Sequence, residues 1–234
     1  PAMVRTFLAG KAGVSVLAAQ HGVSVRVLDI AVDDDLVGVD PAVTAHKVRR
    51  SSGAIHLEDA LTADETARAI AVGETIAAEE IVAGAQLLIS GDMGIGNTTP
   101  TAALIAASLG LPAADVTGHG TGIDEAGLAH KTLIVQQAID RAGERVSDPI
   151  ETLTALGSAD IAATAGFMAA AARAGVPVLL DGVISVAAAI MADRLAPGAA
   201  AWFAAAPSFD RARPGLRARE ARPRADPRPG HAAG

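Results

Sequence analysis

A glycine-rich segment, GDMGIGNTTP at residues 91–100, separates two apolar stretches of the chain. Residues 87–90 have the pattern of a buried strand, and the alanine-rich residues 101–109 predict a helix. A strand that turns through glycines straight into a helix is typical of a parallel sheet, so the segment predicts an α/β fold. It also places backbone N–H groups at the positive end of a helix dipole, where a phosphate can bind. A glycine-rich turn without a ligand is the alternative.

Polar side chains complete this loop. Asp92 follows the end of the predicted strand, and Asn97 and Thr98 add hydrogen-bond donors. Thr99 is predicted to cap the helix, with Pro100 at the first helical position, where its missing N–H costs nothing. The loop is therefore the first candidate binding site.

Composition narrows the class of protein. The chain has 234 residues, and 50% of them are hydrophobic but only 2% aromatic, so its core must rely on close packing of small side chains. A net charge of −7 argues against a nucleic-acid-binding surface. The absence of cysteine excludes disulfides and thiolate chemistry. No uninterrupted apolar run of about 18 residues and no cleavable signal is visible, so we expect a cytoplasmic protein without a nucleic-acid or membrane partner.

Both ends of the sequence differ from the middle. Apolar residues recur at helical spacing from Met3 to Leu17, so the chain opens almost inside a helix, as an upstream truncation or processing of a leader would leave it. Residues 210–234 contain seven Arg, three acidic residues and four Pro. Such a segment buries too little apolar surface to fold and is expected to be disordered. We predict a core domain at residues 1–209 and a basic tail at 210–234, either natural or the product of an altered reading frame.

Between these ends, helices and strands are predicted to alternate. The expected strands are residues 24–32, 87–90 and 176–180. The expected helices are residues 62–83, 101–109, 124–141, 149–156, 159–174 and 183–194. Thr62 and Glu65 have the spacing of a capping box, and Ser158 is expected to cap the helix that follows it. This order predicts a three-layer αβα sandwich around a mostly parallel, Rossmann-like sheet.

A second glycine-rich loop, GHGTGIDE at residues 118–125, runs into a predicted helix. Gly120, Thr121 and Gly122 can wrap an anion as the first loop does, although the two acidic residues that follow also suit a helix start by themselves. Lys131 lies two turns into this helix. Because helical side chains lean toward the N-terminus, its ammonium group can reach a phosphate near the loop. A solvated lysine is the alternative.

A third loop begins at Asp181, directly after the strand predicted at residues 176–180. In an open parallel sheet, ligands bind beyond the carboxyl ends of the strands. Asp92, both glycine loops and Asp181 should therefore share one edge of the sheet and form a ligand site. His119 and His130 lie in the same region without a carboxylate at metal-ligand spacing, so we expect no metal site.

Three of these segments together resemble a known family. GDMGIGNTTPTAAL (91–104), GHGTGIDEAGLAHK (118–131) and VPVLLDGVISVAAAI (176–190) are similar, in this order, to the nicotinate-nucleotide–dimethylbenzimidazole phosphoribosyltransferase family of cobalamin biosynthesis. Residues 3–32 resemble an earlier region of that family, and the resemblance runs to about residue 206. It implies a transferase that works as a homodimer without a cofactor, and a small helical domain that is incomplete here.

The resemblance also implies a reaction, in which the phosphoribosyl group of nicotinate mononucleotide moves to 5,6-dimethylbenzimidazole to give α-ribazole 5′-phosphate and nicotinate. The implied substrate-binding residues are Met93, Gly94, Gly96, Asn97, Thr98, Gly120, Thr121, Gly122, Lys131 and Asp181. Met93 is expected to flank the benzimidazole, and the glycine loops with Lys131 to hold the ribose phosphate. Asp92 stands where other members carry Glu, with a supporting role near the ribose or the leaving group.

The sequence departs from the family in two places. The family's general base is a glutamate in a GEGTGA-like motif near the C-terminus; no such motif occurs here, and Glu220 lacks the flanking glycines. The family's N-terminal segment, which helps to form the benzimidazole pocket, is not matched either. The catalytic base is therefore unassigned. A nucleotide-binding pseudoenzyme, or an unstable fragment without a function of its own, is the alternative to an active transferase.

Overall fold

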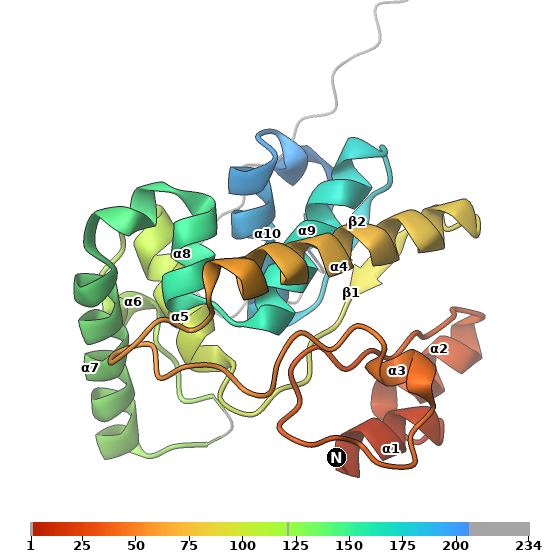
Figure 1. Cartoon of the computed structure of the whole chain (residues 1–234), viewed down its shortest axis with the longest axis horizontal. Coiled ribbons are helices and arrows are strands. Elements are labelled where there is room, and N and C mark those ends of the chain that lie inside the picture. The colour runs from red at the N-terminus through yellow and green to blue at the C-terminus, as the bar shows by residue number, and fades with distance from the viewer. Residues whose placement is uncertain (1, 121, 206–234) are drawn as a thin grey trace, which may run out of the picture.

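The computed structural model of the chain describes residues 2–120 and 122–205. Its sheet consists of three parallel strands, β1 (Leu88–Ser90), β2 (Val178–Leu180) and β3 (Phe203–Ala205), in that order. Figure 1 labels β1 and β2. Ser90 pairs with Leu180, and Leu180 pairs with Ala205, so the strands end at the same edge. The predicted α/β class and parallel sheet are confirmed. The described strands are short, however, and helices make up most of the described part of the chain.

Helices cover most of the remaining described residues. They are α1 (Ala2–Leu8), α2 (Gly13–His21), α3 (Pro41–Thr44), α4 (Ala63–Val82), α5 (Thr98–Leu109), α6 (Ala113–Val116), α7 (Glu125–Ala142), α8 (Pro149–Leu156), α9 (Ala159–Arg173) and α10 (Gly182–Leu195). Two 3-10 helices, η1 (Gly143–Ser147) and η2 (Ala199–Trp202), follow α7 and α10. The helices predicted from residue 62 onward are confirmed, with small differences at their ends. The tail predicted at residues 210–234 lies outside the described residues.

One of the three predicted helix caps described below is present, and two are not. The Thr62 hydroxyl accepts from the Glu65 N–H at 3.2 Å and the Glu65 carboxylate accepts from the Thr62 N–H at 2.9 Å, which completes the capping box. The predicted cap at Thr99 is wrong, because α5 begins at Thr98 with Asn97 in the cap position. Pro100 still lies in the first turn, where N–H groups have no partner within the helix. The Ser158 hydroxyl makes no cap hydrogen bond to α9, so that predicted cap is also wrong.

The strand predicted at residues 24–32 is wrong, because this stretch is an irregular loop. A buried ion pair organises it instead. Asp29 is fully buried, and the Lys47 ammonium group donates to its carboxylate at 2.8 Å. The same ammonium group donates to the carbonyl oxygens of Val32 and Asp34, both at 2.6 Å. Because a buried charge must be paired and hydrogen-bonded, this cluster overrides the strand preference of the β-branched residues.

Helix α4 packs along α9, and glycines allow the two backbones to approach closely (Figure 1). A Cβ atom at Gly73 of α4 would overlap the Ala163 carbonyl oxygen of α9. A Cβ atom at Gly166 of α9 would overlap the Ile70 carbonyl oxygen of α4. Contact between backbones fills this part of the core without large side chains, as expected for a chain with few aromatic residues.

Replacing Gly73 by alanine should lower the free energy of unfolding by about 3 kcal/mol, because the added methyl group forces the two helices apart. Urea unfolding measures this change. The matched control is Gly13→Ala in α2, where a Cβ atom meets nothing within 4 Å. Higher helix propensity should make the control neutral or slightly stabilising. Equal stability of Gly73→Ala and the parent chain would contradict the close contact.

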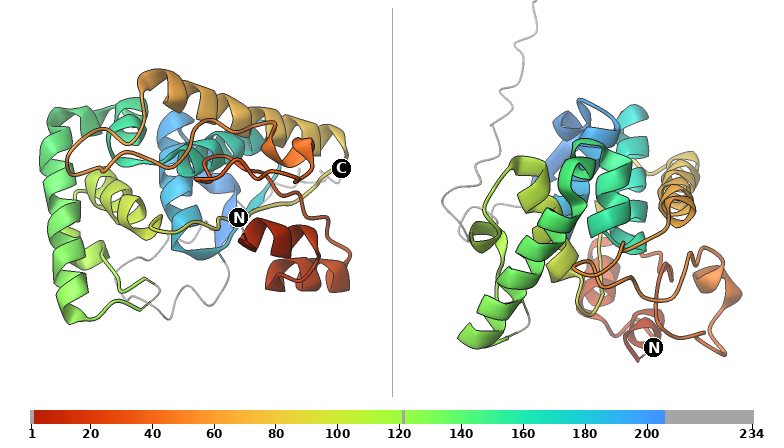
Figure 2. Two further views of the ribbon diagram at one scale, coloured as in Figure 1. Left: turned by 60° about the horizontal axis from the view of Figure 1, so that its bottom comes forward. Right: turned by 60° about the vertical axis from the view of Figure 1, so that its left-hand side comes forward.

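Helices α1 and α2 lie at the side of the molecule opposite α7 (Figure 1 and Figure 2). By length and composition alone, the helical stretch Ala2–His21 passes as a membrane span, with a mean hydropathy of 1.3. The chain turns between α1 and α2, however, and the Ser15 hydroxyl donates to the Phe7 carbonyl oxygen at 3.3 Å. Neither helix alone has the roughly 20 residues that cross a bilayer.

Candidate active site

The loop after β1 borders a cavity of about 760 Å³. Five predicted site residues line it together: Asp92, Met93, Gly94, Gly96 and Asn97. The other walls come from residues of α1, from the segments around 28–33 and 51–56, and from the start of α9. A concave site beyond the carboxyl ends of parallel strands is the usual place for a ligand in an α/β protein. The predicted location of the site is therefore matched by a cavity.

Asp92 lies two residues beyond β1, with two polar neighbours. Asn97 Nδ2 donates to the Asp92 carboxyl oxygen at 2.7 Å, which closes the glycine loop. The Asp160 carboxyl group, in the first turn of α9, lies within hydrogen-bonding contact of Asp92. Burial, followed by the charge of Asp160 and this contact, raises the pKa of Asp92 to about 8. The Asp92 carboxyl group therefore holds a proton more strongly than an ordinary aspartate.

Lys131 joins the two glycine loops. Its ammonium group donates to the hydroxyl of Thr98, the first residue of α5, at 2.8 Å and to the Gly118 carbonyl oxygen at 3.1 Å. Burial lowers the pKa of Lys131. Gly120 lies against the same pair with a φ of +58°, and a Cβ atom there would sit 3.6 Å from the ammonium nitrogen. The ammonium group and the positive end of α5 thus converge beside both loops.

Asp181 directly follows β2, and the strand register puts it at the same edge of the sheet as Asp92, as predicted. Its side chain is exposed and does not line the cavity. Thr121 and Glu220 lie outside the described residues. Gly122, next to Thr121, has a φ of +112°, a backbone conformation that glycine adopts readily. The substrate-binding roles of all the predicted residues stay predictions.

Sequence reasoning missed Ser158, Asp160 and His56, which also line the cavity. Ser158 and Asp160 stand at a predicted helix start, where the sequence pattern of a cap and an acidic first turn is explained without a ligand. The topology of the sheet could have indicated Ser158 and Asp160. In a strand–helix–strand unit the helix runs back over the sheet, so the start of the helix before β2 belongs near the carboxyl edge of the strands. His56 comes from a loop without a recognisable pattern.

Ion pairs fix the cavity wall formed around residues 51–56. Asp59 pairs with Arg141 at 2.6 Å and with Arg145 at 2.9 Å, and Arg141 Nε donates to the Ile55 carbonyl oxygen at 2.9 Å. The hydrogen bond from Arg145, reinforced by Arg141, lowers the pKa of Asp59 to about 2. The network therefore contributes stability above the ordinary aspartate pKa, and this contribution is lost as the pH falls toward 2.

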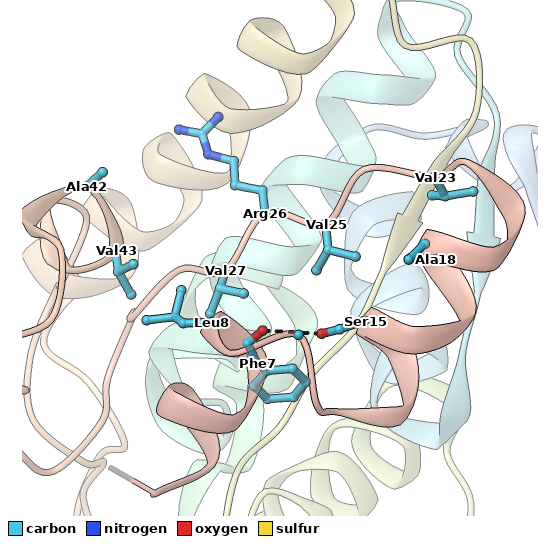
Figure 3. Close-up of a pocket in the computed structure, with 12 residues that line it drawn as sticks. Phe7, Leu8, Ser15, Ala18, Val23, Val25, Arg26, Val27, Ala42 and Val43 are labelled. Atoms are coloured by element: carbon cyan, nitrogen blue, oxygen red, sulfur yellow. Dashed lines mark hydrogen bonds between the residues drawn. The ribbon is translucent and has the colours of Figure 1, made fainter.

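A second cavity, of about 480 Å³, lies beside α1, α2 and the loop that follows them (Figure 3). Its lining is largely apolar and includes Phe7, Leu8, Val25 and Val27. Figure 3 shows Arg26 pointing away from these side chains, and Arg26 pairs with Glu79 and Glu80 of α4. None of the predicted site residues lines this cavity, so it is separate from the candidate active site.

The chain is similar to named proteins over most of its length. A family model described as a phosphoribosyltransferase matches residues 1–218, which extends past residue 206, where we expected the resemblance to end. A nicotinate-nucleotide–dimethylbenzimidazole phosphoribosyltransferase from Mycolicibacterium paratuberculosis is 52% identical over 203 residues. A protein of the same name from Mycobacterium tuberculosis is 53% identical over 203 residues. These matches cover 87% of the chain but only 58% and 56% of the two relatives.

A solved structure is similar as well. The crystal structure of CobT from Thermus thermophilus has a TM-score of 0.81 to this chain at 38% sequence identity. The match covers 87% of this chain and 60% of that one. The chain thus spans less than two thirds of the length of the proteins it resembles.

Proposed function

Because the chain belongs to the nicotinate-nucleotide–dimethylbenzimidazole phosphoribosyltransferase family, we propose that it serves in the transfer of a phosphoribosyl group from nicotinate mononucleotide to 5,6-dimethylbenzimidazole. The products are α-ribazole 5′-phosphate and nicotinate, and the step contributes the lower ligand of cobalamin. The named relatives are longer proteins. The match to this chain covers 58% of the relative from Mycolicibacterium paratuberculosis.

The contact between Lys131 and the start of α5 carries this proposal. A 5′-phosphate beside the Lys131 ammonium group receives a charge-assisted hydrogen bond from it, and further ones from the Thr98 hydroxyl and the N–H groups at the start of α5. Gly120 and Gly122 both have a positive φ, and without side chains they let the second loop approach the phosphate. A held phosphate positions the ribose, and with it the reacting C1′ atom.

The reaction exchanges one ring nitrogen for another at C1′. The bond from C1′ to the nicotinate ring breaks, and its electron pair stays on that ring nitrogen. The lone pair of one benzimidazole nitrogen forms the new bond, and the proton on the other benzimidazole nitrogen passes to a base. Met93 and Ile95 line the cavity with exposed side chains and offer apolar surface to a flat acceptor ring.

A second candidate is a chain that binds the nucleotide without turnover. No GEGTGA-like motif occurs in its 234 residues, so the family's general base has no counterpart in this sequence. Lys131 and Thr98, which we assign to the phosphate, are by contrast present and in contact with each other. We therefore expect strong binding of nicotinate mononucleotide combined with slow transfer.

The purified chain should bind nicotinate mononucleotide and, with 5,6-dimethylbenzimidazole present, form α-ribazole 5′-phosphate much more slowly than a longer relative. Titration calorimetry measures the binding, and chromatography measures the product. A well-folded chain that does not bind nicotinate mononucleotide would contradict the proposed function. A transfer rate close to that of the relative would contradict the loss of the base. Binding without any product would support the second candidate.

We also propose that the protein is a cytoplasmic homodimer, as the family resemblance implies. Light scattering on the eluting chain gives its mass in solution. A monomer at micromolar concentration would contradict the dimer.

A further inference from the structure

Residues 24–28, within the irregular loop after α2, resemble a strand that has no partner. Figure 3 shows Val25 and Val27 on one side of this stretch and Arg26 on the other. Side chains that alternate between two faces in this way are typical of a β-strand. Among the described residues, however, no hydrogen bond involves a backbone N–H or carbonyl group of residues 24–28. The stretch therefore offers a row of free backbone groups, as the edge of a sheet does.

The stretch is held in place at both ends and in the middle. Before it, the Val23 N–H donates to the Ala18 carbonyl oxygen at 2.8 Å. After it, the Asp29 N–H donates to the Val43 carbonyl oxygen at 2.7 Å. Between these points, Arg26 forms ion pairs with two glutamates of α4. A backbone that is already fixed loses little conformational entropy when a second strand pairs with it, so such pairing costs less free energy.

The valine side of the stretch borders the apolar cavity of about 480 Å³ beside α1 and α2. Phe7, Leu8 and Ala18 of these helices line the same cavity. Val25 is 42% exposed and Leu8 is 46% exposed, so apolar surface lies uncovered next to the free backbone groups. This combination suits an extended peptide, because main-chain hydrogen bonds provide affinity while alternate side chains enter an apolar groove.

Charge indicates which kind of strand fits this face. Residues 2–28 include Arg5, Lys11 and Arg26 but no Asp or Glu, although the whole chain has a net charge of −7. The ion pairs to α4 neutralise Arg26, whereas Lys11 is exposed between α1 and α2. Acidic residues beside the apolar residues of an incoming strand are therefore favoured. A second copy of the same basic face is disfavoured, because like charges would meet.

We propose that residues 24–28 and the cavity beside them bind an extended apolar strand flanked by acidic residues. The longer relatives provide its source. The match to the relative from Mycolicibacterium paratuberculosis covers 58% of that protein, so more than a third of it lies outside the match. The strand comes from such an unmatched part. The proposal is independent of the proposed function, because no predicted substrate-binding residue lines this cavity.

Peptides test the proposal. Short overlapping peptides are made to cover the part of the Mycobacterium tuberculosis relative that lies outside the match. At least one of them should slow the amide hydrogen exchange of residues 24–28 in the full 234-residue chain by about tenfold at saturation. Calorimetry gives the affinity of that peptide. A peptide of the same composition in scrambled order should neither bind nor protect these amides.

Two variants of neighbouring residues show whether the peptide uses the cavity. Val25→Asn places an amide among apolar side chains and should weaken binding of the peptide about tenfold. Ser24→Asn is the matched control, because Ser24 does not line the cavity, and this variant should leave the affinity unchanged. Both residues are exposed, so both variants should be as stable as the parent chain, which urea unfolding checks.

Three results would overturn the proposal. The first is the absence of protection at residues 24–28 with every peptide of the set. The second is protection that grows with the concentration of the chain alone, because it would assign this face to a second copy. The third is equal weakening by Val25→Asn and Ser24→Asn, which would place the peptide outside the cavity. None of these measurements involves nicotinate mononucleotide, so the proposed function stands or falls separately.

Discussion

The variant Lys131→Met should bind nicotinate mononucleotide about 100-fold more weakly than the parent chain. The Lys131 ammonium group donates to Thr98 and to Gly118, so it is placed between the two loops that we assign to the phosphate. A charge-assisted hydrogen bond contributes about 1.5–3 kcal/mol, which corresponds to the expected loss. Ribose 5-phosphate should lose affinity to the same extent, because the phosphate is common to both ligands. Titration calorimetry measures both losses.

The chain provides a matched control for this variant. Lys11 is an exposed lysine between α1 and α2, outside the lining of the cavity. Lys11→Met therefore removes the same charge and should leave both affinities unchanged. Unaltered binding of ribose 5-phosphate by a well-folded Lys131→Met chain would show that the phosphate lies elsewhere.

The variant Lys47→Met should lose about 3–5 kcal/mol of stability, because it leaves the carboxylate of Asp29 buried without its partner. Asp29 is 0% exposed, and the Lys47 ammonium group also satisfies two carbonyl oxygens of the same loop. Residues of this loop line the cavity, so the loss should weaken nucleotide binding as well. Urea unfolding measures the stability, and amide hydrogen exchange should show the largest increase at residues 29–34.

A second substitution distinguishes the buried charge from other effects of the change. Adding Asp29→Asn to Lys47→Met removes the unpaired charge and should restore part of the lost stability. Lys11→Met again serves as the control for loss of a lysine charge. A Lys47→Met chain as stable as the parent would mean that the ion pair does not hold the loop.

Several elements of the fold were predictable because they depend on neighbouring residues. The capping box at Thr62 links positions three residues apart, and helix α4 starts there as predicted. Asp124 caps α7 in the same local way, accepting from the Gly127 N–H at 2.8 Å. The glycine loop after β1 was recognisable because a strand, a turn and a helix follow one another without a gap.

The sequence-based predictions that were wrong also have a physical cause. Residues 24–32 carry a strand-like sequence, but the burial of Asp29 with Lys47 decides their conformation, and no local pattern contains that ion pair. The helix start at Thr98 differs from the predicted cap because Asn97 is hydrogen-bonded to Asp92, two residues beyond the preceding strand. Asp160 was overlooked because its place in a first helical turn has a sufficient local explanation.

The sequence alone predicted the helices from residue 62 onward, the parallel strands β1 and β2, and the glycine-rich loops. These elements depend on hydrophobic periodicity, helix caps and the backbone freedom of glycine, which act over a few neighbouring residues. The contacts that give the site its chemistry could be seen only in the folded chain. Lys131 meets Thr98 across 33 residues, and Asp92 meets Asp160 from another element. The protonation of Asp92 depends on how deeply it is buried and which charge faces it, and packing alone sets both.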